Sequence, residues 1–270
     1  MIQYLYLGRV SYDEGLRLQA DIAALVGEGR LKNVLLLLEH PPVLTLGRNG
    51  DRTHVLASDE MLAARGVTLH EINRGGDVTY HGPGQLVGYP IFDLRTLRNP
   101  NGGRMGPVDF VRGMEEALIR VCGGLGVQAG RVAGLTGVWV GAESKIGAIG
   151  IHVAKGITSH GFAFNVTTDL RDFVLIVPCG IADHGVTSLE RELGLGGQGA
   201  RAVPALAAVA DQAARQFGMV FNEQVLALES LEALRASAEP AREFPAEDTP
   251  LCVPAEVERL QGLPRRPVQA

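Results

Sequence analysis

One segment of the chain combines a flexible backbone with side chains that can bind a ligand: Arg74-Gly75-Gly76-Asp77-Val78-Thr79-Tyr80-His81-Gly82-Pro83-Gly84-Gln85. Glycine permits positive φ and close approach of the backbone to a ligand, and the proline between two glycines limits the remaining freedom. Glycine density alone is typical of a plain turn between strands. Four larger side chains favour a different interpretation, because a plain turn carries small polar residues: Arg74, Tyr80, His81 and Gln85. We therefore expect a substrate-holding loop between two apolar strands.

Apolar and alternating runs on both sides of this segment predict a substantial sheet. The expected strands are 2–7, 34–39, 67–72, 86–92, 137–140, 146–153, 161–166 and 173–177, with a short edge strand at 219–221. The expected helices are 12–26 with Ser11 as N-cap, 58–65, 108–121 started by Pro107, 204–217 and 223–236. The strands between residues 127 and 177 follow one another without helices, which favours antiparallel pairing and an α+β fold over a doubly wound parallel sheet.

The composition limits the classes of function. A chain of 270 residues with 46% hydrophobic content can bury a full core. Its formal charge of −5 provides no global positive field for nucleic acid, and its longest apolar run is too short to cross a membrane. We expect a cytoplasmic protein that binds neither nucleic acid nor membrane. Three scattered cysteines predict neither a disulfide framework nor a paired zinc motif. We expect one domain over residues 1–238 and a loosely ordered tail rich in proline and charge over residues 239–270.

The glycine-rich segment resembles the signature of the lipoyl(octanoyl) transferases of lipoate biosynthesis, which runs Arg-Gly-Gly, then Thr-Tyr-His-Gly-Pro-Gly-Gln. Further matching pieces follow in the order of that family over about residues 1 to 220: His40-Pro41-Pro42-Val43-Leu44-Thr45-Leu46-Gly47-Arg48, Gly137-Val138-Trp139-Val140, Lys145-Ile146-Gly147-Ala148-Ile149-Gly150, His160-Gly161-Phe162-Ala163-Phe164-Asn165-Val166 and Ile176-Val177-Pro178-Cys179-Gly180-Ile181. Gly147 and Phe164 depart from the more common Ala and Leu of the family.

The resemblance implies the fold of biotin and lipoate protein ligases, in which helices back a mixed sheet. It also implies transfer of an octanoyl group from octanoyl-acyl carrier protein to a lysine of lipoyl domains, in 2-oxoacid dehydrogenase subunits and in glycine cleavage H protein, with no cofactor and no metal. Cys179 would carry the acyl group as a thioester, and Lys145 would be the catalytic lysine. The expected substrate-binding residues are Arg74, Gly75, Gly76, Tyr80, His81, Gly82, Gly147, Ala148, Ile149, Gly150, His160, Gly161 and Ala163.

The residues themselves are compatible with these two roles. Cys179 follows an apolar run, at a point where side chains reach a cleft, although a lone cysteine is more often a small buried filler. Lys145 begins an apolar strand, although a lone lysine is ordinarily solvated. A cysteine thiol needs a base to become a nucleophile, and burial of a lysine favours the neutral amine that can serve as one. Cys122, within a helical apolar stripe, and Cys252, in the tail, are expected to be non-catalytic.

Three other functions remain open on the sequence. An ATP-dependent lipoate or biotin protein ligase shares the expected fold, but its Arg-Arg-x-Ser-Gly-Gly-Gly or Gly-Arg-Gly-Arg loop is absent from this sequence. A zinc or ligand-binding module would use His81, His160, His184 and Cys179, which show no short ligand spacing. A thioesterase would use the same cysteine and lysine, with water in place of the acceptor amine.

Overall fold

The computed structural model describes residues 1–99, 102–177, 184–194 and 202–240. Its large sheet contains β1 (Ile2–Arg9), β2 (Asn33–Glu39), β6 (Gln85–Ile91), β7 (Gly130–Val132), β8 (Leu135–Val140), β9 (Ser144–Ala154), β10 (Ile157–Asn165), β11 (Gly185–Val186) and β12 (Val225–Ala227). A small sheet contains β3 (Val43–Leu46), β4 (Thr68–Glu71) and β5 (Val78–His81). The helices are α1 (Tyr12–Gly27), α2 (Asp59–Ala64), α3 (Pro107–Gly124), α4 (Leu189–Gly194), α5 (Leu206–Phe221) and α6 (Leu231–Ala236), with short 3-10 turns η1 (Arg52–His54) and η2 (Leu170–Leu175).

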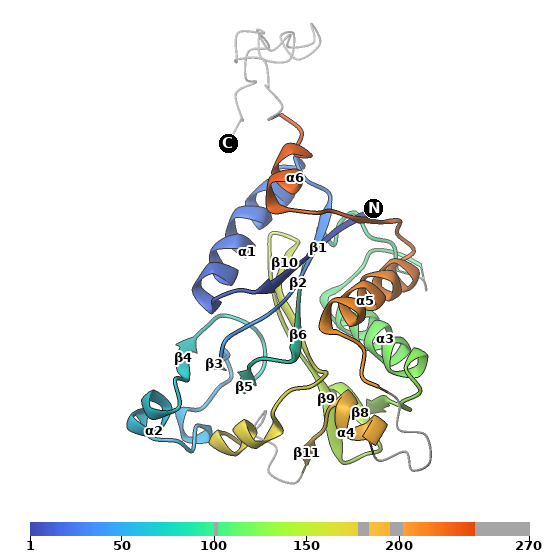
Figure 1. Cartoon of the computed structure of the whole chain (residues 1–270). Coiled ribbons are helices and arrows are strands. Elements are labelled where there is room, and N and C mark those ends of the chain that lie inside the picture. Colours follow the sequence, from blue (N-terminus) through green and yellow to red (C-terminus); the bar gives the residue numbers. More distant parts are fainter. Residues whose placement is uncertain (100–101, 178–183, 195–201, 241–270) are drawn as a thin grey trace, which may run out of the picture. The chain divides into compact units, whose positions relative to one another are not determined.

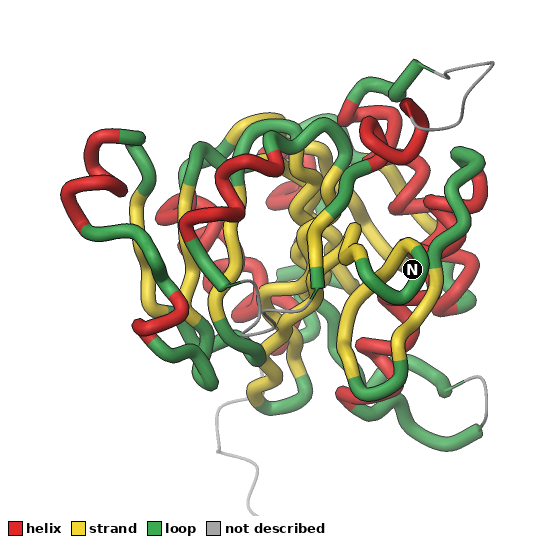
Figure 2. The backbone as a smooth tube through the Cα atoms, turned by 90° about the horizontal axis from the view of Figure 1, so that it is seen from below, coloured by secondary structure: helices red, strands yellow, loops and turns green. Residues whose placement is uncertain are grey.

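The large sheet is mixed and has helices on both faces. Its order is β12-β1-β2-β6-β10-β9-β8-β7, with β11 paired to β9. β1 runs parallel to both neighbours, whereas the pairs from β2 through β7 are antiparallel. The antiparallel pairing among β7, β8, β9 and β10 is the one expected for strands without intervening helices. Helices α3 and α5 cover one face, and α1 and the small sheet lie on the other (Figures 1 and 2). The expected α+β class, a mixed sheet backed by helices, is therefore confirmed.

Alternation along the central strand β2 shows how the sheet separates two cores. Leu35 and Leu37 face the core formed with α3 and α5, whereas Leu36 and Leu38 face the core formed with α1. All four side chains are fully buried, because successive residues of a strand point to opposite faces and both faces are covered. A third, smaller core lies around the small sheet and η2.

The two long N-terminal helices begin where the sequence predicts. The Ser11 hydroxyl accepts a hydrogen bond from the Glu14 amide at 3.3 Å and caps α1, and Pro107 occupies the first turn of α3. Their apolar stripes are buried against opposite faces of the large sheet. The large sheet is therefore held between these two helices.

Four local predictions are wrong. The segment 173–177 is not a strand: η2 forms there, capped by Asp169, with Phe173 and Leu175 in the third core and Val174 exposed. The segment 219–221 belongs to α5, because the buried apolar face of that helix continues to Phe221. The expected helix 223–236 divides into the edge strand β12 and the short helix α6. The glycine-rich segment is not wholly a loop, since its middle forms β5.

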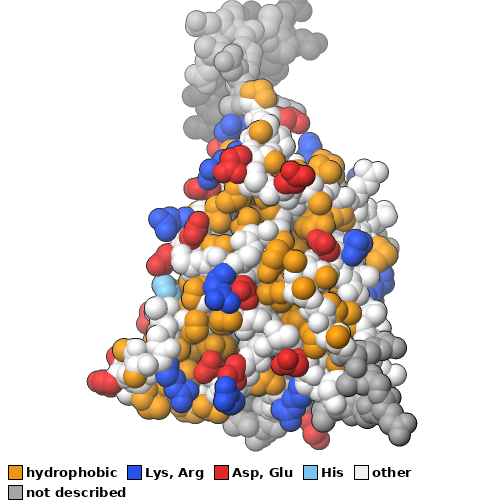
Figure 3. Space-filling model, viewed as in Figure 1, with side chains coloured by type: hydrophobic (Ala, Val, Ile, Leu, Met, Phe, Trp, Pro, Cys, Tyr) orange, Lys and Arg blue, Asp and Glu red, His pale blue; other side chains and the backbone are white. Residues whose placement is uncertain are grey.

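The described residues up to Glu239 form one compact unit. The expected tail lies, from residue 241 onward, outside the described residues. In the part of the chain that the structure describes, no helix has both the length and the apolar character needed to cross a membrane. On the face seen in Figure 3, basic and acidic side chains are interspersed among hydrophobic ones.

Candidate active site

A cavity of about 460 Å³ lies between the small sheet and the face of the large sheet opposite α3 and α5. Strands β5, β6, β8, β9 and β10, the start of α1 and the segment before β5 contribute its walls. The lining residues are Tyr12, Asn49, His54, Arg74, Gly76, Asp77, Val78, Thr79, His81, Val87, Tyr89, Gly134, Leu135, Thr136, Lys145, Ala148, Ile149, Gly150, His160, Gly161, Phe162 and Ala163. The cavity therefore gathers segments that are far apart in the sequence.

The Arg-Gly-Gly segment joins the two sheets at the edge of this cavity. Arg74 is buried and donates from Nη2 to the Thr45 carbonyl at 2.7 Å, which ties it to β3. Gly75 donates its N–H to the Ile151 carbonyl of β9 at 2.9 Å. A Cβ at position 150 would lie 2.5 Å from the Gly75 carbonyl oxygen, so β9 requires glycine at this crossing. The Arg-Gly-Gly motif thus brings the small sheet into close contact with β9 of the large sheet.

His81, in β5, is neutral and its tautomer follows from its partner. Burial lowers the pKa of His81 to about 3. Gln85 donates from Nε2 to the Tyr80 carbonyl at 3.0 Å, so its Oε1 faces His81 Nδ1 at 2.8 Å and accepts the ring proton. The Gln85 amide also donates to Asn165 Oδ1 at 2.9 Å, which fixes its orientation. His81 Nε2 is therefore the acceptor nitrogen of a ring that lines the cavity.

An aromatic cluster that sequence reasoning missed supports His81. The His81 ring stacks on Tyr12 at 6.1 Å between centroids and meets His40 edge-on at 5.9 Å. His40 Nδ1 donates to the Val10 carbonyl at 2.7 Å, and the Tyr89 hydroxyl donates to Nε2 at 2.7 Å. Burial lowers the pKa of His40 to about 4. His40 stands in a quoted motif, but nothing in the sequence indicates that Tyr12 and Tyr89 line the cavity.

His160 adopts a backbone conformation that is uncommon for a residue with a side chain. Its φ is +56°, and its buried N–H donates to Gln19 Oε1 of α1 at 2.6 Å. The ring Nε2 lies 2.8 Å from Asn73 Oδ1 and donates to it, while burial, followed by the Arg74 charge, lowers the pKa of His160 to about 4. Helix α1 thus holds the part of β10 that presents this neutral ring to the cavity.

Lys145 lies at the start of β9 and is 8% exposed. Its Nζ lies 4.7 Å from the centroid of the Trp139 ring. Val186 of β11 pairs with Lys145 on the other side, and Thr187 donates its N–H to the Lys145 carbonyl at 3.0 Å. The lysine therefore reaches the cavity from between two neighbouring strands, with its stem buried.

The cavity includes most of the expected site residues. Those that line it are Arg74, Gly76, His81, Lys145, Ala148, Ile149, Gly150, His160, Gly161 and Ala163. Four do not line it: Gly75, Tyr80, Gly82 and Gly147. Tyr80 points into the third core, where its hydroxyl donates to Asp172 Oδ2 at 2.7 Å, and Gly82 packs against the Tyr80 ring. Gly147 lies toward Leu118 and Phe164, on the helix-covered face.

Cys179 lies outside the described residues. The residues that flank segment 178–183 can nevertheless be placed. Val177 donates its N–H to the His54 carbonyl at 2.8 Å, and His54 lines the cavity. His184 packs edge-on against Trp139 at 5.3 Å between centroids. Of the described residues on either side of this segment, Val177 therefore contacts a residue that lines the cavity, and His184 contacts the ring that lies against Lys145.

The sequence also contains no indication that His54 and Asp77 pair at the cavity. His54 Nδ1 lies 2.5 Å from Asp77 Oδ2, and Asp77 Oδ1 accepts the Asp51 N–H at 3.2 Å. Both His54 and Asp77 line the cavity. Among the residues that the structure describes, no group of three or more His, Cys, Asp or Glu side chains is arranged to hold a metal ion.

Residues 11–218 match the family model described as the lipoyl protein ligase A/B catalytic domain. The chain belongs to this family. It is 60% identical over 238 residues to the octanoyltransferase of Acidobacterium capsulatum, covering 85% of this chain and 94% of that protein. It is 53% identical over 246 residues to the octanoyltransferase of Koribacter versatilis, covering 90% of this chain and 94% of that protein. These relatives confirm the resemblance to lipoyl(octanoyl) transferases and the expectation that the chain is an acyltransferase.

A solved structure of lipoate-protein ligase A bound with ATP has a TM-score of 0.66 to this chain at 18% identity, covering 88% of this chain and 92% of that protein. At this identity the likeness shows the fold alone. The expected similarity to the lipoate ligase fold is therefore confirmed.

Proposed function

We propose that this family member transfers an octanoyl group from octanoyl-acyl carrier protein to a lysine of a lipoyl domain, through a thioester on Cys179, with Lys145 as general acid and base. The observation that carries the proposal is the buried Lys145 side chain at a cavity walled by small residues of β9 and β10, with the flanks of segment 178–183 beside it. The octanoyltransferase relatives support the acyl group and the reaction class.

In the first half of the reaction, the thiolate of Cys179 attacks the thioester carbonyl of the donor. A C–S bond to the enzyme forms, the C–S bond to the phosphopantetheine breaks, and the Lys145 ammonium gives its proton to the departing thiolate. One thioester replaces another, so this half needs no nucleotide.

In the second half, the lysine amine of the acceptor domain attacks the octanoyl-enzyme. Lys145 accepts the proton lost by that amine, an amide C–N bond forms, and the Cys179 thiolate leaves. The same two residues thus serve both halves, and the conversion of a thioester to an amide drives the second half forward. The acceptors in this proposal are lipoyl domains of 2-oxoacid dehydrogenase subunits and glycine cleavage H protein.

The cavity suits an unbranched acyl chain. Ala148 and Ala163 place only methyl side chains on the cavity wall along two adjacent strands, and Val87 and Ile149 supply apolar contacts. Full burial of an eight-carbon chain contributes about 5 kcal/mol, at ~0.8 kcal/mol for each methylene. A shorter chain forfeits part of this free energy, which gives the site a basis for selecting chain length.

His81 is assigned an accepting role rather than a donating one. Because its only proton is committed to Gln85, the ring cannot donate a hydrogen bond to the oxyanion of a tetrahedral intermediate. Its Nε2 can accept a hydrogen bond from an N–H or O–H of the substrate. We therefore assign His81 to substrate orientation in this proposal.

Intact-mass measurement tests the proposed function. Protein incubated with octanoyl-acyl carrier protein and no ATP is expected to gain one octanoyl group, which peptide mapping locates at Cys179. Cys122→Ala is the matched control, because burial raises the pKa of the Cys122 thiol to about 12 and leaves it unreactive. An adduct on another cysteine, or acylation that requires ATP and free octanoate as in a ligase, contradicts the proposal. Release of free octanoate in the presence of a lipoyl domain would indicate a thioesterase instead.

A further inference from the structure

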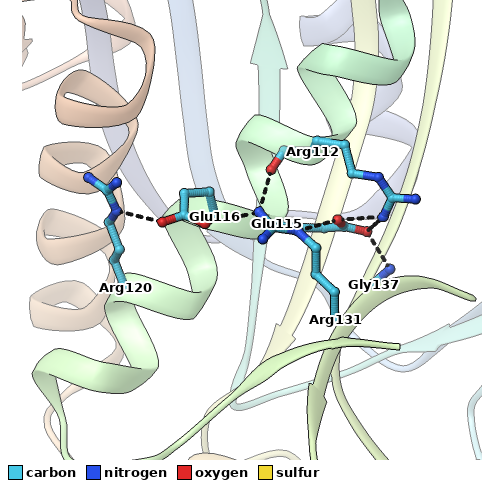
Figure 4. Close-up of polar contacts among 6 residues, drawn as sticks. All are labelled: Arg112, Glu115, Glu116, Arg120, Arg131 and Gly137. Carbon is cyan, nitrogen blue, oxygen red and sulfur yellow. Dashed lines mark hydrogen bonds and ion pairs between the residues drawn. The ribbon is translucent and has the colours of Figure 1, made fainter. Parts of the chain in front are cut away.

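A fully buried carboxylate lies outside the cavity and has no part in the reaction proposed above. Glu115, on α3, has no exposed side-chain surface. Arg112 Nη1 donates to its two oxygens at 2.9 and 2.7 Å, and Arg131 Nε donates to Oε2 at 2.9 Å. The third donor is the backbone N–H of Gly137, at 3.0 Å from Oε1 (Figure 4). The carboxylate thus connects α3, β7 and β8 at a single point.

Gly137 forms the wall against which the Lys145 stem packs. A Cβ at position 137 would lie 3.4 Å from Lys145 Cε and 2.6 Å from the Gly147 carbonyl oxygen. The φ of Gly137 is +126°, a conformation that side-chain-bearing residues rarely adopt. The hydrogen bond to Glu115 therefore fixes a stretch of β8 that requires glycine, directly beside the lysine.

Two residues after Gly137, the same strand places the Trp139 ring beneath Lys145 Nζ. Trp139 pairs with Lys145 across a register shift, where Val138 pairs with Gly147. Such bulges re-aim side chains at functional sites. Gly137 and Trp139 thus form two sides of one slot for the lysine, and Glu115 holds the strand that carries both.

We propose that Glu115 is a positioning residue for the Lys145 amine: through the Gly137 N–H it fixes β8 so that the glycine and the Trp139 ring hold the lysine in its working place. The inference depends on the proposed role of Lys145 in proton transfer. A displacement of the amine by a fraction of an ångström lengthens the proton-transfer distance and slows the chemical step, with little effect on donor binding.

The chain offers a matched control on the same helix. Glu116 also accepts from Arg131, at 3.0 Å, and from Arg120, at 2.9 Å, but it makes no hydrogen bond to β8 and is partly exposed (Figure 4). A Glu116→Gln variant removes the same charge from the same helix and perturbs the same arginine. Any difference from Glu115→Gln therefore reports the buried carboxylate with its contacts to Arg112 and Gly137, rather than the charge of α3.

Trp139 supplies a direct readout, because it is the only tryptophan of the chain. Its ring is 1% exposed and lies against Lys145 and His184. In Glu115→Gln we expect a changed emission spectrum, faster quenching by acrylamide, and a rate of enzyme octanoylation at saturating donor that falls about tenfold or more, with KM within about twofold. Glu116→Gln is expected to match the wild type in all three measurements.

A folded Glu115→Gln protein with wild-type emission and octanoylation rate would overturn the inference. If that variant does not fold, Arg131→Met decides, since Arg131 is 37% exposed and its loss removes only one donor to Glu115. In Arg131→Met, smaller changes in Trp139 emission and in octanoylation rate support the inference, and wild-type values of both overturn it. Lys145→Met separates the two proposals: full activity in that variant overturns the role of Lys145 itself, whereas an inactive Lys145→Met beside an unchanged Glu115→Gln overturns the positioning role alone.

Discussion

The two faces of the large sheet hold a buried carboxylate and three buried imidazoles in opposite ways. On the side of α3, the Glu115 carboxylate is surrounded by two guanidinium groups and a backbone N–H. On the side of the cavity, three imidazoles have lowered pKa values and are neutral at pH 7: His40, His81 and His160. Burial penalises the charged form of any group, so a buried charge must either be paired or be lost. The carboxylate is paired, and the imidazoles lose their protons.

A paired carboxylate suits the side of α3, and neutral imidazoles suit the cavity. The glutamate holds secondary-structure elements together, where arginine side chains reach it from the surface. The histidines line or adjoin a cavity of about 460 Å³ that must accept an apolar chain. Neutral rings with fixed hydrogen bonds add no charge that the apolar chain would have to desolvate, and His81 Nε2 still offers an acceptor. Three changes test this contrast: a lower pH, the removal of the Glu115 carboxylate, and the introduction of a negative charge beside His81.

The largest expected effect is acid destabilisation through the three histidines. Their folded pKa values lie below the unfolded value of 6.5, so their contribution to stability is fully present above pH 6.5. It is lost as pH falls through the folded pKa values of about 4 for His40 and His160 and about 3 for His81. At pH 5 the free energy of unfolding should be lower than at pH 7 by roughly 2 kcal/mol for each ring. Urea titrations at the two pH values measure it. His81→Asn should lose about a third of this pH dependence; an unchanged dependence in that variant would contradict the assignment.

The next effect concerns the carboxylate. Glu115→Ala leaves two guanidinium groups and the Gly137 N–H without their acceptor, and loss of one partner of a buried ion pair costs about 3–5 kcal/mol. We expect the urea midpoint at pH 7 to fall accordingly with an unchanged m-value. A loss below about 1 kcal/mol would show that water replaces the carboxylate and that the cluster does not hold the strands.

A smaller effect is expected when a charge is placed beside the neutral rings. Gln85→Glu puts a carboxylate oxygen opposite His81 Nδ1 and another opposite the Tyr80 carbonyl, which loses its donor. The unmatched carbonyl costs about 1–3 kcal/mol, and the new negative charge raises the pKa of His81. The ¹⁵N shifts of the ring at pH 7 should change from those of the neutral form toward those of the imidazolium. A ring that stays neutral would show that desolvation outweighs the introduced charge.

Much of this arrangement could be predicted from the sequence, because periodicity reports which faces are covered. The buried runs of β2 and β6 and the capped helices α1 and α3 were all expected near their observed bounds. Local patterns did not distinguish η2 from a strand, because an apolar run of five residues fits both and only the Asp169 cap and the third core select the turn. Likewise, tertiary packing extends α5 through Phe221.

The residues of the candidate site were likewise predicted only where a local motif indicates them. The motifs predicted His81, Lys145, His160 and most of the small residues of β9 and β10 that line the cavity, whereas Gly147 of β9 faces the helices. They did not indicate that Tyr80 turns away, because neighbouring residues of a strand point to opposite sides and β5 was not predicted. Contacts between distant segments, such as Glu115 with Gly137 or His54 with Asp77, leave no local pattern in a single sequence.

The smallest expected effect belongs to Glu116, and it separates charge from burial as the cause of the contrast between the two faces. Its carboxylate pairs with Arg120 and Arg131, so a count of ion pairs would rank it beside Glu115. The Glu116 side chain is 34% exposed, however, and water takes over most of what the arginines provide. Glu116→Gln should therefore change the free energy of unfolding by about 0.5 kcal/mol or less, and raised salt should reduce even that. A loss as large as that of Glu115→Ala would mean that the net charge of α3, rather than the buried hydrogen bond to Gly137, holds β8 against the helix.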